Sequence, residues 1–199
     1  MLKNRYYVMR HGESSANASG IIASDPLTAK RKFGLTKQGR RQVLNTVTAS
    51  FKSYAFDRIY TSDFLRARET AEIAAECFGI RSVIHTSLLR ERFFGTLDGE
   101  KDSEYQKAWE LDESGMGLDC YGIETPDEVL DRLLSLIREC EKKHTGETIL
   151  LVSHGDPLQI ILAAYEGIGP RNHRSVAHLN IAEIRELVPH ENFTLEENI

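Results

Sequence analysis

Two histidines follow directly on apolar segments that have the character of buried strands. Arg10 and His11 come after the run from Tyr6 to Met9, and His154 comes after the run from Ile149 to Val152. In an open parallel sheet, ligands bind beyond the carboxyl ends of the strands, where loops lead into helices whose first amide groups point outward. If both strands lie in one sheet, His11 and His154 meet at that edge, where imidazoles and a guanidinium can bind an anion.

Arg66 is a further candidate for an anion site. It lies in the first turn of a helix that we expect to follow a strand at 58–61, with Ser62 and Asp63 as cap residues, and to reach Phe78. A cation in that turn opposes the partial positive charge of the helix end, at a cost of about a few tenths of a kcal/mol unless an anion lies between them. An exposed arginine with its head in water is the alternative. The position beyond a strand end favours an anion ligand.

Length and composition are those of a soluble, folded protein. A chain of 199 residues can bury about 70% of its unfolded surface. The hydrophobic fraction of 41% and the charged fraction of 28% are close to the usual globular mixture. Neither an internal repeat nor a linker interrupts the sequence, so we expect a single domain over residues 1–199, of which the polar and acidic residues 188–199 form a loose tail.

Charge and hydropathy narrow the classes of partner. The formal charge is −5 and no dense run of lysine and arginine interrupts it, so the electrostatic footprint of a nucleic-acid-binding protein is missing. The longest apolar run, at 160–165, is far shorter than the roughly 20 residues that span a bilayer. Arg10 and His11 also end the first apolar segment too early for a signal peptide. We therefore expect neither nucleic acid nor a membrane as a partner.

The three cysteines, Cys77, Cys120 and Cys140, are odd in number and lack the spacing of metal ligands. Reduced thiols in a cytoplasm are the natural assignment. We accordingly expect a cytoplasmic protein without a metal site.

The apolar pattern places strands and helices in turn. Expected strands are residues 6–9, 58–61, 82–86 and 148–152, with one or two more within 176–187. Expected helices are residues 37–51, the segment ending at 78, 105–111, a helix from 126 onward and 157–165. Helix caps are predicted at Thr36, at Asp156, and at Thr125, where Pro126 and Glu128 complete a capping box.

Residues 12–34 form a long polar connection, and a connection of that length in a compact domain is usually functional or mobile. It contains the basic cluster Lys30-Arg31-Lys32. A solvated loop is one interpretation of this cluster, and recruitment of an anionic substrate is the other.

Five short motifs occur in one order along the chain. They are Arg10-His11-Gly12-Glu13-Ser14 with Asn17, Leu35-Thr36-x-x-Gly39-x-x-Gln42, Ser62-Asp63-x-x-Arg66-Ala67-x-x-Thr70-Ala71, Leu89-x-Glu91-x-x-Phe94-Gly95, and Ser153-His154-Gly155. Together they resemble the histidine phosphatase superfamily, in its phosphoglycerate-mutase-like branch. The resemblance covers about residues 6 to 160, and five motifs in register are far more specific than one.

The resemblance implies an α/β fold, a three-layer α/β/α sandwich with a mainly parallel central sheet, that uses no metal and no cofactor and acts on a small phosphorylated substrate. It also implies a role for each matching residue: His11 as the nucleophile that carries the phosphoryl group, Arg10, Arg66 and His154 as the phosphate pocket with Asn17 assisting, and Glu91 as the proton donor. The paired strand-end histidines and Arg66 agree with the reasoning from the residues, whereas the role of Glu91 as acid comes from the resemblance alone. By itself, a glutamate among arginines and aromatic residues is more often part of a surface ion pair.

The protonation state of Glu91 depends on its surroundings. Flanking Arg90 and Arg92 would favour the ionised form, whereas a bound phosphate dianion would favour the protonated form. We expect the substrate to dominate if both arginines point away from Glu91.

Three activities are compatible with the resemblance. Mutases of this branch carry a Trp-Arg-Arg-Ser-Tyr type segment for the second anionic group of phosphoglycerate, whereas the corresponding residues 104–112 contain Trp109 without paired arginines. We therefore expect a metal-independent phosphatase that hydrolyses phosphate monoesters through phospho-His11. A phosphoglycerate mutase and a catalytically inactive phosphate-binding module are the alternatives, and the complete set of His11, Glu91 and His154 disfavours the second.

Other features leave the substrate open. Ala16 and the segment from Asp156 to Gln159 depart from the common pattern around the pocket mouth, so sugar phosphates, phosphoglycerate, nucleotides and phosphopeptides all remain candidates. The oligomeric state is open too, with a homodimer as one alternative. We assign structural roles to the histidines without a motif, which are His85, His144, His173, His178 and His190.

Overall fold

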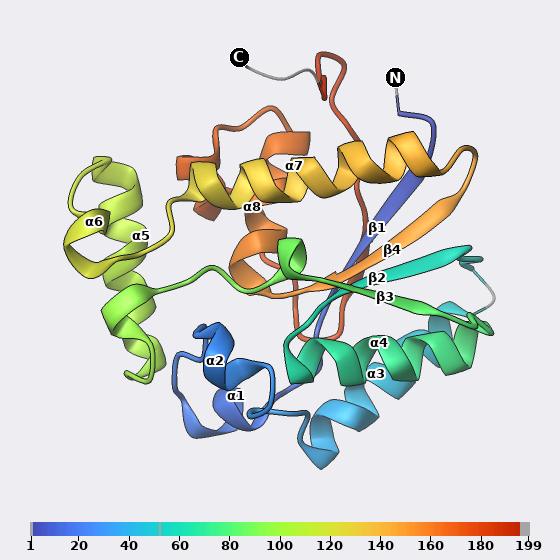
Figure 1. Cartoon of the computed structure of the whole chain (residues 1–199), viewed down its shortest axis with the longest axis horizontal. Coiled ribbons are helices and arrows are strands. Elements are labelled where there is room, and N and C mark those ends of the chain that lie inside the picture. The colour runs from blue at the N-terminus through green and yellow to red at the C-terminus, as the bar shows by residue number, and fades with distance from the viewer. Residues whose placement is uncertain (1, 52, 196–199) are drawn as a thin grey trace.

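A five-stranded sheet forms the centre of the computed structural model, which describes residues 2–51 and 53–195. The strand order is β3-β2-β4-β1-β5 (Figure 1). The strands are β1 (Arg5–Arg10), β2 (Arg58–Ser62), β3 (Val83–Thr86), β4 (Thr148–Ser153) and β5 (Ile184–Glu186). The first four run parallel, and β5 pairs antiparallel with β1 at the edge. The sheet is therefore mainly parallel, as predicted.

Strands β1 and β4 lie side by side in matched register. Arg10 pairs with Ser153, so both strands end at the same level. The backbone N–H of His11 donates to the Ser153 carbonyl at 3.0 Å, which continues the pairing by one residue. This register places His11 and His154 at one edge of the sheet, where their sequence positions predicted them.

Helices cover both faces of the sheet. The helices α3 (Lys37–Ser50) and α4 (Leu65–Phe78) pack on one face, and α7 (Pro126–Lys143) and α8 (Gly155–Tyr165) pack on the other (Figure 1). Side chains alternate along each strand. Tyr7 and Met9 therefore pack in the core on the α3 and α4 side of the sheet, while Tyr6 and Val8 pack in the core on the α7 and α8 side. The three-layer α/β/α sandwich is confirmed.

Caps explain where several helices begin. Thr36 caps α3, and Thr125 forms a reciprocal capping box with Glu128 at the start of α7, as predicted. Two predictions were wrong: α4 begins after Phe64, without a cap from Ser62 or Asp63, and α8 begins after His154, without a cap from Asp156. The reason is that these polar side chains have other partners, Arg90 for Asp63 and Arg92 for Asp156.

A third group of elements lies beyond the carboxyl edge of the sheet. It contains the short helices α1 (Ser15–Ser19) and α2 (Pro26–Ala29) within the polar connection, and α5 (Tyr105–Ser114) and α6 (Leu118–Tyr121) (Figure 1). Single 3-10 turns lie at Ser87–Leu89, Gly95–Leu97 and Asp102–Glu104, and a longer one at Pro170–Ser175. A separate apolar cluster joins these elements, made of Ile22, Phe94, Leu97, Ala108, Leu118 and Ile123. The long connection is thus part of a packed wall.

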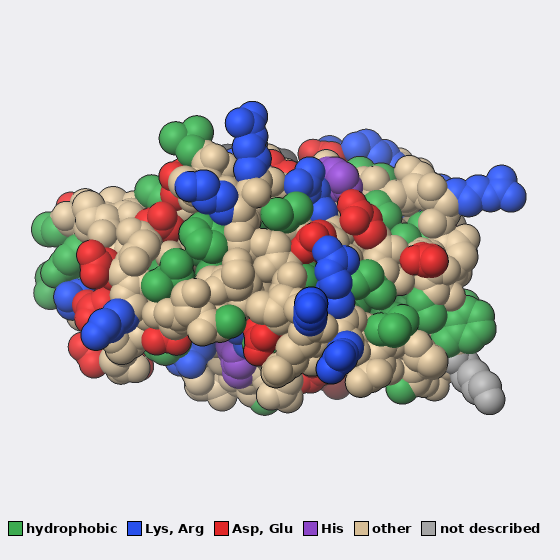
Figure 2. All heavy atoms as spheres, turned by 90° about the horizontal axis from the view of Figure 1, so that it is seen from below, with side chains coloured by type: hydrophobic (Ala, Val, Ile, Leu, Met, Phe, Trp, Pro, Cys, Tyr) green, Lys and Arg blue, Asp and Glu red, His purple; other side chains and the backbone are tan. Residues whose placement is uncertain are grey.

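Charged side chains of both signs share the surface. On the face that Figure 2 shows, lysines and arginines are interspersed with aspartates and glutamates. Lys30 of the basic cluster pairs with Asp63 at 3.2 Å, and Arg31 and Lys32 are exposed. This arrangement favours the interpretation of the cluster as a solvated loop.

The end of the chain departs from the predicted loose tail. The Phe193 ring lies 4.1 Å from the Tyr165 ring between centroids, and Leu195 packs against the same core. The tail prediction is therefore wrong for these residues, and residues 196–199 lie outside those described. Within the described chain, none of the helices has the length and apolar character needed to cross a membrane.

Candidate active site

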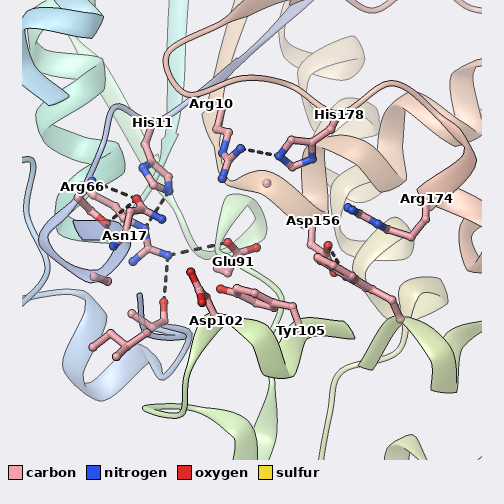
Figure 3. A pocket seen from close by; sticks show the side chains of 16 residues that line it. Arg10, His11, Asn17, Arg66, Glu91, Asp102, Tyr105, Asp156, Arg174 and His178 are labelled. Atoms are coloured by element: carbon pink, nitrogen blue, oxygen red, sulfur yellow. Dashed lines mark hydrogen bonds and ion pairs between the residues drawn. The ribbon is translucent and has the colours of Figure 1, made fainter. Parts of the chain in front are cut away.

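A cavity of about 360 Å³ opens beyond the carboxyl ends of β1 and β4 (Figure 3). Five of the six predicted site residues line it, namely Arg10, His11, Asn17, Arg66 and Glu91. The sixth, His154, lies fully buried beside His11, with 5.1 Å between the two ring centroids. The fold therefore brings all six into one place from four separate stretches of sequence.

His11 is held as a neutral imidazole in one tautomer. Its Nδ1 lies 2.7 Å from the Gly12 carbonyl oxygen, which can only accept, so Nδ1 carries the proton. Its Nε2 accepts a hydrogen bond from Nε of Arg66 at 3.0 Å. Burial, followed by the charges of Arg66 and Arg10, holds the pKa of His11 well below its ordinary value. The unprotonated Nε2 is the atom that a nucleophile needs.

Close backbone contacts fix the loop after His11. A Cβ on Gly12 would lie 2.6 Å from the Gly39 carbonyl oxygen, and one on Gly39 would lie 2.0 Å from the Glu13 carbonyl oxygen. The N–H groups of Gly12 and Glu13 donate to the side chains of Thr70 and Gln42, at 3.1 and 3.0 Å. The second and third sequence motifs thus position the first.

Two arginines face the cavity with donors that have no partner. Arg10 donates from NH1 to the Leu179 carbonyl at 2.9 Å and to Nε2 of His178 at 2.5 Å, and Arg66 donates from NH2 to the Ala23 carbonyl at 3.0 Å. The buried Nε of Arg10 and NH1 of Arg66 lack any hydrogen-bond acceptor among the described residues. Burial lowers the pKa of both groups. Buried cationic donors of this kind favour an anionic ligand.

His154, a neutral imidazole beside His11, also has a buried ring nitrogen without a partner among the described residues. Its Nε2 lies 2.9 Å from the Ser62 hydroxyl oxygen, which already accepts from the Phe64 N–H at 3.2 Å. If the hydroxyl donates to Nε2, the ring proton lies on Nδ1, which is buried and has no hydrogen-bond partner among the described residues. The opposite tautomer would leave both that nitrogen and the hydroxyl proton unsatisfied. The first tautomer is therefore favoured, and it leaves the Nδ1–H of His154 without an acceptor among the described residues.

Glu91 is a buried carboxyl group between the two arginines. Burial raises its pKa to about 7, against the opposing charges of Arg66 and Arg10. Its flanking arginines turn elsewhere: Arg90 makes two bonds to Asp63, at 2.7 and 2.6 Å, and Arg92 makes two to Asp112, at 2.7 and 2.6 Å. The condition that we set from the sequence is met. Glu91 can hold a proton near neutral pH.

Asn17 has a structural contact as well as a place in the cavity wall. Its Oδ1 accepts from the backbone N–H of Ser14 at 3.0 Å and from the Ser14 hydroxyl at 2.8 Å, completing the capping box of α1. This bonding fixes the amide group, so its Nδ2 remains the atom available to a ligand.

The sequence of the chain matches the model of the histidine phosphatase superfamily (branch 1) over residues 6–196. The chain belongs to the histidine phosphatase superfamily. A metal-independent phosphoserine phosphatase of Arabidopsis thaliana is 27% identical over 90% of the chain and 76% of its own length. Phosphoglycerate mutase-like protein 4 of the same plant is 31% identical over 82% and 70%, respectively.

Solved structures of the superfamily share the fold. A mycobacterial glucosyl-3-phosphoglycerate phosphatase with bound VO3 superimposes with a TM-score of 0.77 at 22% identity, over 92% of this chain and 91% of the other. A phosphoserine phosphatase of Entamoeba histolytica, in complex with 3-phosphoglyceric acid, gives a TM-score of 0.75 at 23% identity, over 92% and 89%. These likenesses establish the architecture.

One side of this superfamily member's cavity is made of Trp109, Asp156, Arg174 and His178. Trp109 and Asp156 lie in segments that the sequence already connected with the substrate, whereas Arg174 and His178 were not predicted there. The structural role that we assigned to His178 was incomplete, because its ring lies in the cavity wall and contacts Arg10. No motif surrounds Arg174 or His178, so only the fold could place them. His144, by contrast, ends α7 and bonds the Tyr60 hydroxyl at 2.8 Å, a structural role as predicted.

Proposed function

We propose that this superfamily member hydrolyses phosphate monoesters through a phosphohistidine formed on His11, with no requirement for a metal ion. The observation that carries the proposal is the unprotonated Nε2 of His11 beside buried donors of Arg10, Arg66 and His154 that have no acceptor within residues 2–51 and 53–195. These cationic and neutral donors supply the positive charge that phosphoryl transfer needs around the phosphate oxygens. The phosphohistidine mechanism is general to the superfamily, which adds support.

In the first step, the phosphate dianion accepts from Arg10 Nε, Arg66 NH1 and His154 Nδ1. Arg66 Nε transfers its hydrogen bond from His11 to a phosphate oxygen, which frees the lone pair of His11 Nε2. This nitrogen attacks phosphorus in line with the ester oxygen, the P–O bond breaks, and Glu91 gives its proton to the leaving alkoxide. The bound dianion favours the protonated state of Glu91 before this transfer.

In the second step, Glu91 is ionised and takes a proton from a water molecule. The water oxygen attacks phosphorus and the P–N bond breaks. The electron pair of that bond returns to Nε2 of His11, and inorganic phosphate is released. Glu91 ends the cycle protonated and His11 ends it neutral, so atoms and charges balance. One difficult displacement is divided into two easier ones.

Hydrolysis is favoured over transfer to a second hydroxyl. The α5 segment that carries Trp109 offers no paired arginines to retain a bisphosphorylated intermediate, and its Asp112 is engaged by Arg92. A phosphoryl group on His11 would therefore pass to water. Because similar proteins include both a phosphoserine phosphatase and a phosphoglycerate mutase, the two outcomes need separate assays.

The test is release of inorganic phosphate from a panel of phosphate esters in the presence of a chelator, by the parent and by the His11→Ala variant. We expect hydrolysis by the parent and its loss in the variant. Exchange of label between the positions of phosphoglycerate that exceeds hydrolysis would instead establish a mutase. A parent that binds phosphate without turnover would establish a binding module.

A further inference from the structure

Beside the phosphate pocket, the cavity has a second wall made of Trp109, Arg174 and His178. Figure 3 labels Arg174 and His178 on this side of the cavity. The wall is rigidly supported. Asp156 accepts from the indole N–H of Trp109 at 3.0 Å, and the guanidinium carbon of Arg174 lies 3.7 Å from the centroid of the Trp109 ring. Stacking of this kind fixes the plane of a guanidinium.

Gln159 fixes the same wall from the other side. This buried side chain donates to the Val176 carbonyl at 2.6 Å, so its oxygen faces Arg174 NH1 and accepts from it. The His178 ring bridges from this oxygen, 3.4 Å from its Nδ1, to NH1 of Arg10, 2.5 Å from its Nε2. A continuous network therefore joins Arg174, through Gln159 and His178, to Arg10 of the phosphate pocket.

Arg174 lacks a counter-charge in this network. Among residues 2–51 and 53–195, no carboxylate oxygen lies within the 4.0 Å that defines an ion pair with it. Asp156, a carboxylate that also lines the cavity, is already engaged by Arg92 at 3.2 Å and by the indole N–H of Trp109. One N–H of Arg174 is used by Gln159, and the remaining donors are available to a ligand in the cavity.

We propose that the wall of Trp109, Arg174 and His178 binds the leaving group of the substrate and selects phosphate esters whose alcohol portion carries a carboxylate. The proposal rests on the proposed phosphatase function, because it assumes that the phosphate group occupies the pocket beside His11. Arg174 is then a specificity-determining residue, and Asp156 and Gln159 are positioning residues for it.

Charge favours a carboxylate over a second phosphate. Arg174 is the one cation of the wall, because partial burial and the charges of Arg10 and Arg174 lower the pKa of His178 to about 4 and keep it neutral at pH 7. A single guanidinium matches a monoanionic, planar carboxylate, which it can bind with two parallel N–H donors. A phosphate dianion would leave one negative charge uncompensated beside Asp156.

The experiment compares the binding of 3-phosphoglycerate and glycerol 3-phosphate by calorimetry. These esters share the phosphate-bearing carbon and differ in a carboxylate against a hydroxymethyl group. Using the His11→Ala protein prevents turnover, and the parent supplies kcat/KM values for the same pair. We expect 3-phosphoglycerate to bind about 10- to 100-fold more tightly, the worth of a charge-assisted pair of hydrogen bonds.

The Arg174→Gln substitution should reduce this preference to within about twofold of unity, since the neutral amide forms no charge-assisted bond. The matched control is Arg171→Gln in the same 3-10 turn, where the arginine is exposed and pairs with Asp127, and it should retain the preference. Equal affinity of the two esters for the His11→Ala protein, or a preference that survives Arg174→Gln, would overturn the proposal. Failure of the parent to hydrolyse any ester would instead reject the phosphatase function, and the binding preference would still report on the wall.

Discussion

Nε of Arg66 lies 3.0 Å from Nε2 of His11 and donates to it. A guanidinium has no acceptor atom, so this contact requires that Nε2 of His11 be unprotonated, with its lone pair toward Arg66. The same arginine therefore keeps the proposed nucleophile unprotonated and, by a small shift of its hydrogen bond, can release it to an incoming phosphate.

Replacing Arg66 by Met should raise the pKa of His11, because the charge of Arg66 is the largest cause of the lowered pKa after burial itself. A raised pKa leaves more His11 protonated at low pH, so the acidic limb of kcat/KM should move to higher pH. The measurement is a pH profile with p-nitrophenyl phosphate, which needs no proton for its leaving group. Arg68→Met, which changes an arginine of α4 bonded to the Lys30 carbonyl, is the control. An acidic limb that stays in place would show that Arg66 does not set the protonation state of His11.

Glu91→Gln should slow hydrolysis of an alkyl phosphate by about 100- to 10,000-fold and that of p-nitrophenyl phosphate much less, since only the alkoxide needs a proton to leave. The parent's kcat/KM for the alkyl ester should also fall as pH rises through about 7, where Glu91 loses its proton. Comparing the two esters across pH 5 to 9 checks both statements. Equal losses with both esters would remove Glu91 from the role of acid.

Glu91→Gln should also stabilise the fold at alkaline pH. The folded pKa is raised to about 7 from an ordinary value near 4.5, so the ionised carboxylate costs folding free energy that is absent below about pH 4 and fully present above about pH 7. We expect a gain of about 1–3 kcal/mol in the free energy of unfolding at pH 8 and a much smaller one at pH 4. Urea unfolding at the two pH values measures this, and a gain independent of pH would refute the assignment.

Ser62→Ala should reduce kcat because it removes the hydroxyl that selects the tautomer of His154. Without that partner the ring proton can lie on Nε2, and the phosphate loses a donor worth about 1 kcal/mol or more. Ser62→Thr retains the hydroxyl and should recover most of the activity. If alanine and threonine variants lose activity equally, the effect is one of packing and the hydroxyl does not direct the tautomer.

The arrangement of strands was predictable because each signal was local. The apolar runs ending at Arg10 and at Ser153 predicted two buried strands, and the rule that ligands bind at the carboxyl ends of parallel strands predicted that His11 and His154 would meet. Helix starts were less predictable. Asp156 looked like a cap, yet its carboxylate turns toward Arg92 and Trp109, a tertiary preference that no local pattern reports.

The candidate site likewise contains residues that the sequence predicted and residues that it did not. Residues within the motifs converge as expected, whereas Arg174 and His178 reach the cavity only because the 3-10 turn after α8 folds back over it. The pKa of Glu91 was also beyond the sequence, because it depends on burial and on the directions of Arg90 and Arg92. Sequence alone therefore could not place Arg174 and His178 in the wall that we propose for the leaving group.

The most direct test of phosphoryl transfer through His11 is to stop turnover of p-nitrophenyl phosphate with an alkaline quench, which preserves an acid-labile P–N bond, and to locate the phosphoryl group by peptide mass spectrometry. We expect a phosphoryl group on His11, detected more strongly in Glu91→Gln if water activation limits the second step, and absent in His11→Ala. A phosphoryl group on any other residue, or turnover that persists in His11→Ala, would contradict it.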